Sequence, residues 1–187
     1  MEKYKEYVAN LAKSGTNNTF INSDEQHAEV VFENLFPIAK EYLRIFASCL
    51  CSPVVNSKYI ENLSDFIERG GKVRVLLNEY EEEKSQKSNL FLRLAYYKSL
   101  RKDIVLKSTD VKPYYANAPE NKVHFTIADN NAYRIETDTE KRTANCNFNN
   151  EEVGKGLVEF FDNIFNNVSS KEIDLLGLFN LQNNGNE

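Results

Sequence analysis

Helix-type and strand-type segments alternate along the first two thirds of this chain, and this order constrains the fold more than any other feature of the sequence. Amphipathic helix-type runs cover residues 2–13, 23–39, 57–71 and 89–102, and β-rich runs cover 42–48, 72–78 and 103–108. Such alternation is typical of parallel strands joined by helices that cover both faces of a sheet. The sequence therefore predicts an α/β fold with a mixed, mostly parallel sheet and helices on both faces.

Three further strand-type runs follow closely, at 122–129, 132–138 and 142–148. The first two are joined by Asn130-Asn131, and asparagine tolerates the positive φ that a tight hairpin needs. These runs predict antiparallel strands added to the sheet, and the amphipathic run at 150–167 predicts a closing helix.

We expect three parts along the chain: an N-terminal helix and connector at 1–17, a main domain at 18–168, and an apolar C-terminal tail at 169–187. The tail carries leucines and a phenylalanine between residues 175 and 181. Such a patch either folds back on the core or docks onto a partner chain through residues 172–182. The sequence leaves both alternatives open.

Composition limits the class of protein and of partner. The 187 residues are 41% hydrophobic and 27% charged, which is a globular composition. A net charge of −5 does not favour general binding to nucleic acid, which needs a basic face. The sequence contains no run of 18 apolar residues that would predict a membrane span, and its N-terminus is too polar for a signal peptide. The cysteines at 49, 51 and 146 lack the spacing of a zinc site. We expect a cytoplasmic protein without a membrane segment, metal or cofactor.

His124 is the residue that the sequence singles out for chemistry. It is one of only two histidines, and Lys122 and Thr126 share its face of a predicted strand. Three interpretations stay open: a strand histidine without chemistry, a phosphate-binding or regulatory group, or a nucleophile. The other histidine, His27, is expected at the surface, in the first turn of a helix.

Four runs together resemble the phospholipase D-like (HKD) superfamily: AEVVFENLFPIAKEYLRIFAS, YIENLSDFIERGGKVRVLLN, KVHFTIADNNAYRIE and TANCNFNNEEVGKGLVEFFDNIF. The resemblance spans about residues 18–167 and covers a single half-domain. The family motif is H-x-K-x4-D with a downstream Ser/Thr-x-Asn. Set on His124, the motif places Thr126 at the lysine and Asn131 at the aspartate, with Asp129 two residues early. Asn145 or Asn147 takes the downstream asparagine position.

The resemblance implies a metal-independent reaction in which histidine attacks phosphorus while lysine holds the phosphate oxygens. Two such motifs face each other in the family, so the single motif here implies a homodimer with both His124 side chains at the two-fold axis. Thr126 supplies no cation where phosphate charge grows, which weakens any catalysis. Lys122 and Arg134 are among the cations that stand near His124 in sequence.

We therefore expect a degenerate phospholipase D-like protein that acts as a non-catalytic binding, assembly or regulatory subunit. Small stand-alone chains of this kind resemble accessory components of bacterial defence operons, such as phage-defence systems, or of mobile-element operons. The alternative is a divergent nuclease or phosphodiesterase in which His124 attacks with support from Asn145. The phosphate-binding residues would then be Lys122, Thr126, Arg134 and Asn147.

Overall fold

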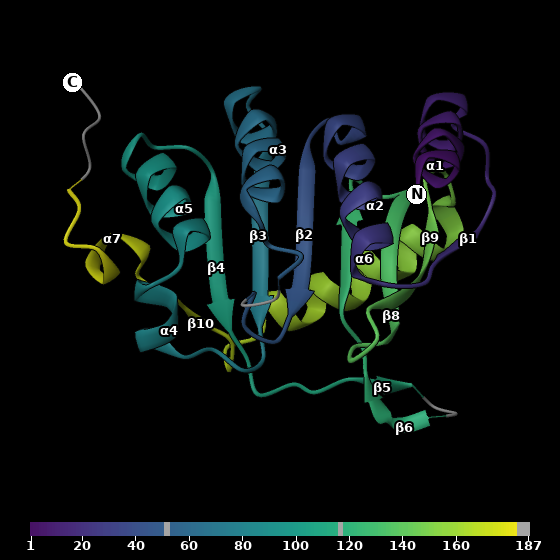
Figure 1. Ribbon diagram of the computed structural model, residues 1–187. Helices are drawn as coiled ribbons and strands as arrows, with labels where there is room; N and C mark the ends of the chain where they lie inside the picture. The colour runs from purple at the N-terminus through teal and green to yellow at the C-terminus, as the bar shows by residue number, and fades with distance from the viewer. Residues whose placement is uncertain (51–52, 116–117, 183–187) are drawn as a thin grey trace.

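The computed structural model describes residues 1–50, 53–115 and 118–182, and Cys51 lies outside the described residues. One eight-stranded sheet runs through the molecule (Figure 1). Its strands, from one edge to the other, are β1 (Phe20–Asn22), β9 (Thr143–Asn147), β8 (Ala132–Asp138), β7 (Phe125–Ala128), β2 (Tyr42–Ala47), β3 (Lys72–Leu77), β4 (Ile104–Ser108) and β10 (Lys171–Glu172).

Helices cover both faces of this sheet (Figure 1). One face carries α1 (Glu2–Ser14), α2 (Glu25–Ile38), α3 (Ser57–Glu68) and α5 (Asn89–Ser99), and the other face carries α6 (Glu151–Phe165). Two short helices, α4 (Glu82–Gln86) and α7 (Leu175–Leu178), and a small hairpin of β5 (Tyr114–Tyr115) and β6 (Ala118–Lys122) complete the described elements.

The alternation of side chains along β2 divides the core into two clusters. Leu43 and Ile45 join the larger cluster under α2 and α3, whereas Phe46 joins a smaller cluster with Phe161 and Phe165 of α6. A strand that is apolar on both sides needs a helix layer on each face. This pattern explains why a segment as short as YLRIFA occupies the middle of the sheet.

The mixed α/β class and the helices on both faces are confirmed, but the parallel part of the sheet is smaller than the sequence predicts. Among the described strands, only the pairs β2–β3 and β3–β4 are parallel. The other five pairs are antiparallel, because the hairpin strands β7, β8 and β9, together with β1 and β10, extend the sheet on both sides.

The helix boundaries follow local chemistry. Asp24 caps α2, because its carboxylate accepts the backbone N–H of His27. Pro37 lies in the last turn of α2 and the helix ends one residue later, as expected for proline. His27 stacks on the ring of Tyr4, with a centroid distance of 3.8 Å, and it contacts Ser23 Oγ at 2.6 Å. The ring stacking ties α1 to α2.

The C-terminal tail folds back on its own chain. Strand β10 pairs with the edge of β4, and Ile173 and Leu175 are buried in the larger core cluster. Leu178, Phe179 and Leu181 pack against the same cluster. The apolar patch is thereby used within the molecule, and docking of a partner through residues 172–182 stays a prediction. No helix in the described ranges is long and apolar enough to span a membrane.

Candidate functional site

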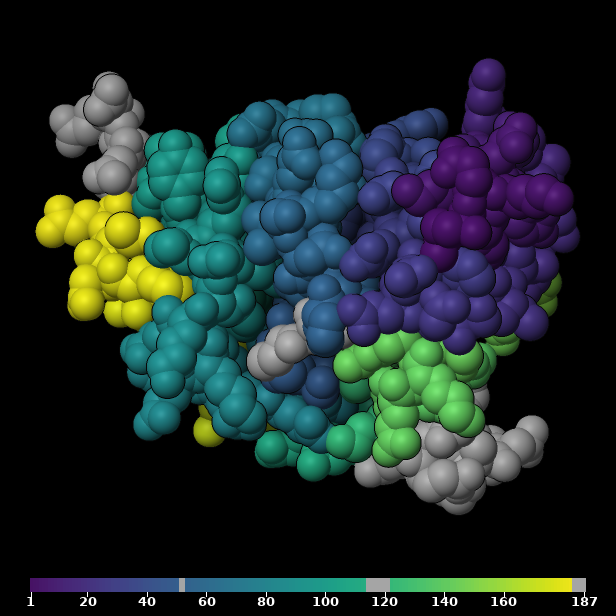
Figure 2. Space-filling view, in the orientation of Figure 1, coloured from purple at the N-terminus to yellow at the C-terminus, as the bar shows by residue number. Residues whose placement is uncertain are grey.

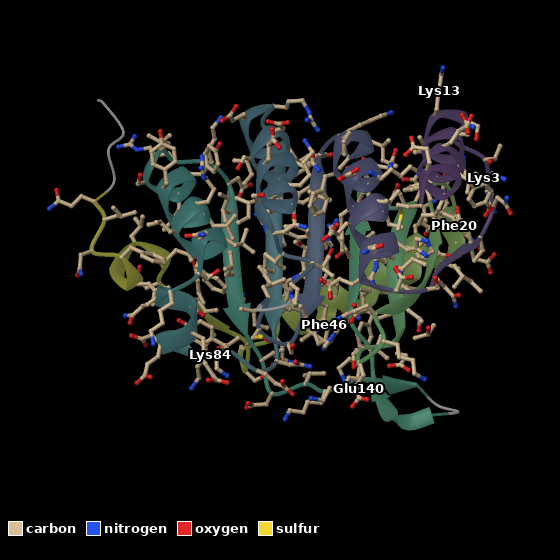
Figure 3. All side chains as sticks on the ribbon, viewed as in Figure 1. Lys3, Lys13, Phe20, Phe46, Lys84 and Glu140 are labelled. Atoms are coloured by element: carbon tan, nitrogen blue, oxygen red, sulfur yellow. The ribbon has the colours of Figure 1, made fainter. Side chains whose placement is uncertain are left out.

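His124 lies at the edge of the sheet where the parallel strands β2 and β3 end. It immediately precedes β7, which runs antiparallel to β2, so the start of β7 faces the carboxyl end of β2; Phe46 pairs with Phe125 there. Figure 3 shows Phe46 at this lower edge, together with Glu140 from the β8–β9 connection. In open α/β sheets, ligands bind outside the carboxyl ends of the strands.

Cross-strand pairing gathers four polar side chains on the face that α2 and α3 cover. Thr126 is paired with Arg134 of β8, and the backbone N–H of Glu136 donates to the carbonyl of His124. Phe125 and Ile135, which alternate with these residues, pack on the α6 side instead. The strand alternation therefore buries His124, Thr126, Arg134 and Glu136 together.

Glu136 is the centre of this polar cluster. Its two carboxylate oxygens lie 3.1 Å from Nδ1 of His124 and 3.0 Å from Nη1 of Arg134, and Nη1 of Arg142 is 3.9 Å away. Burial by itself would raise the pKa of the Glu136 carboxyl. The hydrogen bond with His124 and the charge of Arg134 outweigh burial, so this pKa lies below its usual value. Glu136 is therefore ionised at neutral pH.

Arg134 is fully engaged in holding the cluster together. Its Nε donates to Oδ1 of Asn22 at 2.7 Å and its Nη2 donates to the carbonyl of Arg142 at 3.1 Å. The guanidinium also lies 5.3 Å from the ring centroid of Phe32. Each nitrogen of this guanidinium thus has a partner within the protein.

Asn22 of β1 and Arg142 complete the arrangement. The Asn22 amide nitrogen also donates to the carbonyl of Arg142, at 2.6 Å. Arg142 takes a left-handed backbone conformation with φ of 60°, which is uncommon for a residue other than glycine. Two buried donors converge on its carbonyl, so this turn is part of the cluster.

A cavity of about 200 Å³ lies beside the cluster. Its polar side includes His124, Thr126, Arg142 and the half-buried Cys49. Its apolar walls come from α2, the end of β2, the segment that leads into α3, α3 itself and the start of β7. They include Phe32, Ile45, Phe46, Leu50, Val54 and Tyr59. Figure 2 shows the β8–β9 connection (green) reaching the lower front face beside α2, next to this region. Nε2 of His124 is buried and has no hydrogen-bond partner among the described residues.

The structure brings some of the predicted site residues together and separates others. Thr126 lines the cavity and Arg134 lies in the cluster, whereas Lys122 forms an ion pair with Glu79 at the same edge of the sheet. Asn145 is exposed, and it pairs with Ile135, whose side chain packs on the α6 side. Asn147 is buried and donates to Asn17 and Thr19 in the N-terminal connector. Within the described part of the chain, no hydrogen bond joins either asparagine to His124.

The residues at the aspartate position of the motif lie at the other end of β7. The carboxylate of Asp129 accepts the backbone N–H groups of Lys40, Glu41 and Tyr42, at 2.8–3.0 Å. The Asn131 side chain donates to Asn149. Asp129 and Asn131 therefore hold the turn after β7 and the start of β2, and neither orients His124.

Glu136 and Asn22 belong to the site but were not predicted from the sequence, whereas Arg142 was expected as one of the cations that could lend charge to a phosphate. The spacing of Arg134 and Glu136, two residues apart on a strand next to the histidine strand, is the signal that could have found Glu136. Asn22 carries no local signal, because it joins the cluster from a strand that is 112 residues away from Arg134. Within the described ranges, no three His, Cys, Asp or Glu side chains gather as ligands for a metal ion.

Solved structures of other proteins share the fold of this chain. No family model and no curated protein matches this chain. Among solved structures it is similar to TrmBL2, an archaeal chromatin protein, with a TM-score of 0.59 and 13% identity over 89% of this chain. The match spans 58% of TrmBL2, so this chain corresponds to little more than half of that protein.

The chain is also similar to two proteins over nearly their whole length. These are Nuc, a phospholipase D family member from Salmonella typhimurium, with a TM-score of 0.56 and 15% identity, and NucT from Helicobacter pylori, with 0.55 and 12%. Each match covers 84% of this chain and 99% of the other. At these identities the likeness establishes a phospholipase D-like fold.

Proposed function

We propose that this chain is a non-catalytic binding module built on a phospholipase D-like fold, and that it holds a small ligand in the cavity beside His124. The observation that carries this proposal is the engagement of Arg134. This arginine is the cation paired with Thr126 across β7 and β8, and its guanidinium is committed to Glu136, Asn22 and the carbonyl of Arg142.

Phosphoryl transfer needs fixed positive charge where negative charge grows on the phosphate oxygens. Here the lysine position is a buried threonine, and Glu136 offsets the charge of Arg134. Lys122 is held by Glu79. Removal of one preorganised donor typically costs on the order of 10²–10³ in rate, and loss of a cation costs more. The site is therefore better suited to holding a ligand than to cleaving a phosphodiester.

A role as an accessory subunit fits this proposal. TrmBL2, which shares the fold, is described as a chromatin protein with a novel mode of DNA binding, so the fold serves binding in at least one relative. The net charge of −5 does not favour DNA as the ligand of this chain. We place it instead as a binding or regulatory component of a bacterial defence system, acting as a homodimer.

A divergent phosphodiesterase is the second candidate, and one observation favours it. Glu136 fixes Nδ1 of His124, while Nε2 has no hydrogen-bond partner among the described residues. A carboxylate that orients an imidazole in this way is the usual support for a histidine that attacks or transfers a proton.

A cleavage assay separates the two candidates. The purified protein would be incubated with bis(p-nitrophenyl) phosphate, single- and double-stranded DNA, and RNA, with and without a chelator. We expect no cleavage above background. Chelator-resistant cleavage that is lost in His124→Ala and kept in the control His27→Ala would overturn the binding proposal. The control is suitable because His27 lies in α2, where it stacks on Tyr4 of α1, and does not line the cavity.

A further inference from the structure

We infer that two copies of this chain join through a groove between α3 and α5, with α5 of each copy seated over α3 of the other. The inference rests on the proposed function, in which the chain acts as a homodimer, and it names the surface that joins the two copies. It follows from exposed apolar side chains on α5 and from the opposite charges on the two sides of the groove.

The groove has a volume of about 1160 Å³ and lies on the face of the sheet opposite α6. Helices α3 and α5 lie side by side on this face (Figures 1 and 2). The apolar residues that line the groove and are buried or half-buried include Val55, Ile60, Leu90, Tyr97 and Leu181. Both helices lie between parallel strands in the chain, so both begin at the carboxyl edge of the sheet and run in the same direction.

Helix α5 carries apolar side chains on more of its circumference than the fold covers. Leu90, Phe91 and Leu94 are buried, whereas Leu92 and Tyr96 are 48% and 51% exposed. These two exposed residues are four positions apart, so they lie on one face of the helix, and both line the groove. A helix that is apolar on all sides is usually buried, and exposed apolar patches mark sites of protein interaction. This face of α5 is therefore suited to contact with another protein surface.

The two sides of the groove carry opposite charges. The charged residues that line it are all exposed: Glu61, Asp65 and Glu68 on α3, and Lys84, Lys87 and Arg93 on the side of α4 and α5. Three acidic and three basic groups balance, so the groove does not favour a partner of one charge. A surface that is acidic on one half and basic on the other is complementary to its own copy. A two-fold interface joins one patch to the same patch of the second copy.

Charge also selects the orientation of the two copies. A two-fold axis parallel to the helices places α5 of one copy over α3 of the other, so that the basic side meets the acidic side. An axis within the interface but perpendicular to the helices would place α3 over α3, and the acidic groups would then repel one another. The parallel axis is therefore the favourable one.

The levels of the residues along the two helices identify the contacts. The hydroxyl of Tyr97 donates to Glu68 at 2.5 Å, so these two residues lie at the same level of the groove. Arg93 is four residues before Tyr97, and the rise per residue is the same in both helices, so it lies four residues before Glu68 and next to the level of Asp65. An axis parallel to the helices preserves these levels. Arg93 of one copy thus faces Asp65 of the second copy, and this contact occurs twice.

Analytical ultracentrifugation of the full-length protein over a range of concentrations tests this interface. We expect the wild type to dimerise. Arg93→Glu and Asp65→Arg, each alone, place like charges in both contacts and should weaken the dimer by at least about tenfold. Lys155→Glu makes the same change of charge as Arg93→Glu, but at an exposed position of α6 on the opposite face, and should leave the dimer unchanged.

An equal mixture of Arg93→Glu and Asp65→Arg should recover the dimer, because each contact between the two variants then joins opposite charges. Only a contact between copies gives this recovery. If Arg93→Glu dimerises as well as Lys155→Glu, or if the mixture dimerises no better than the two variants alone, the inference is overturned.

A second pair of variants tests the apolar part of the interface. Leu92→Ser should weaken the dimer about tenfold, since each copy loses a leucine that the other copy covers. Leu100→Ser is the matched control, because Leu100 is 41% exposed just after α5 and does not line the groove. Equal effects of the two substitutions would count against the groove. Circular dichroism checks the folding of each variant.

The outcomes separate this inference from the proposed function. A wild type that stays monomeric at all concentrations would overturn both this interface and the proposed homodimer. A dimer that Arg93→Glu and Leu92→Ser leave intact would overturn the interface alone. Neither result bears on the cleavage assay, because His124 does not line the groove.

Discussion

Nδ1 of His124 lies 3.1 Å from the carboxylate of Glu136, and both side chains are at least nine-tenths buried. The same carboxylate binds Arg134 at 3.0 Å, so one negative charge links the histidine strand to the only arginine on β8. The carboxylate of Glu136 therefore fixes the orientation of the His124 imidazole. It also neutralises the charge of Arg134, which phosphoryl transfer would need as a free cation.

Replacing Glu136 by glutamine should destabilise the protein. The change keeps the shape of the side chain but leaves Arg134 buried without its counterion, and breaking a buried pair costs about 3–5 kcal/mol. We expect the free energy of unfolding, measured by urea denaturation, to fall by about that amount. The exposed Glu140→Gln provides the control and should change it by less than about 0.5 kcal/mol. Equal stability of both variants would contradict the importance of the cluster.

The same carboxyl predicts how stability depends on pH. The pKa of Glu136 is lower in the folded protein than the 4.5 of an exposed glutamate. Its contribution is therefore present above pH 4.5 and is lost as the pH falls through the folded pKa. The difference in unfolding free energy between wild type and Glu136→Gln should be constant near neutral pH and should shrink below pH 4.5. If this difference instead grew as the pH fell, the pKa of Glu136 would be raised by folding and not lowered.

Asp129 should matter for the stability of the fold. Its carboxylate accepts three backbone N–H groups at the start of β2, and its own φ is 54°. Asp129→Ala removes these acceptors and should lower the free energy of unfolding by about 1–3 kcal/mol. Asp129→Asn, which tolerates a positive φ and keeps one acceptor, should lose less. An Asp129→Ala variant as stable as the wild type would contradict this role.

Restoring a lysine at position 126 should not restore phosphodiesterase chemistry. Thr126 is buried and is paired with Arg134, so a lysine there would bring a second cation into an enclosed site. We expect Thr126→Lys to lose at least about 2 kcal/mol of stability and to cleave no bis(p-nitrophenyl) phosphate. Thr126→Val is the control for loss of the hydroxyl. Cleavage by Thr126→Lys would mean that a missing lysine is the only barrier to catalysis.

The sequence predicts the position of His124 well and the composition of its cluster poorly. Strand periodicity places His124 and Thr126 on one face, and the chain order brings them to the edge beside Phe46. Glu136 joins through pairing between strands, which a linear motif does not contain.

The asparagines and the sheet direction were harder to predict for the same reason. Asn145 matches the downstream motif in sequence, yet the register of β9 turns it toward the opposite face. Likewise, the alternating segments correctly predict the parallel strands β2, β3 and β4. They do not show how far β1 and β10, at the two edges, extend the sheet with antiparallel pairs.

The central claim, binding at His124 without covalent chemistry, is tested most directly by intact-protein mass spectrometry after incubation with bis(p-nitrophenyl) phosphate. The protein would be denatured at alkaline pH, where phosphohistidine survives. Our account predicts an unmodified mass at every time point. An added p-nitrophenylphosphoryl group, formed with release of one p-nitrophenolate, that is present in the wild type and in His27→Ala but absent from His124→Ala would contradict it.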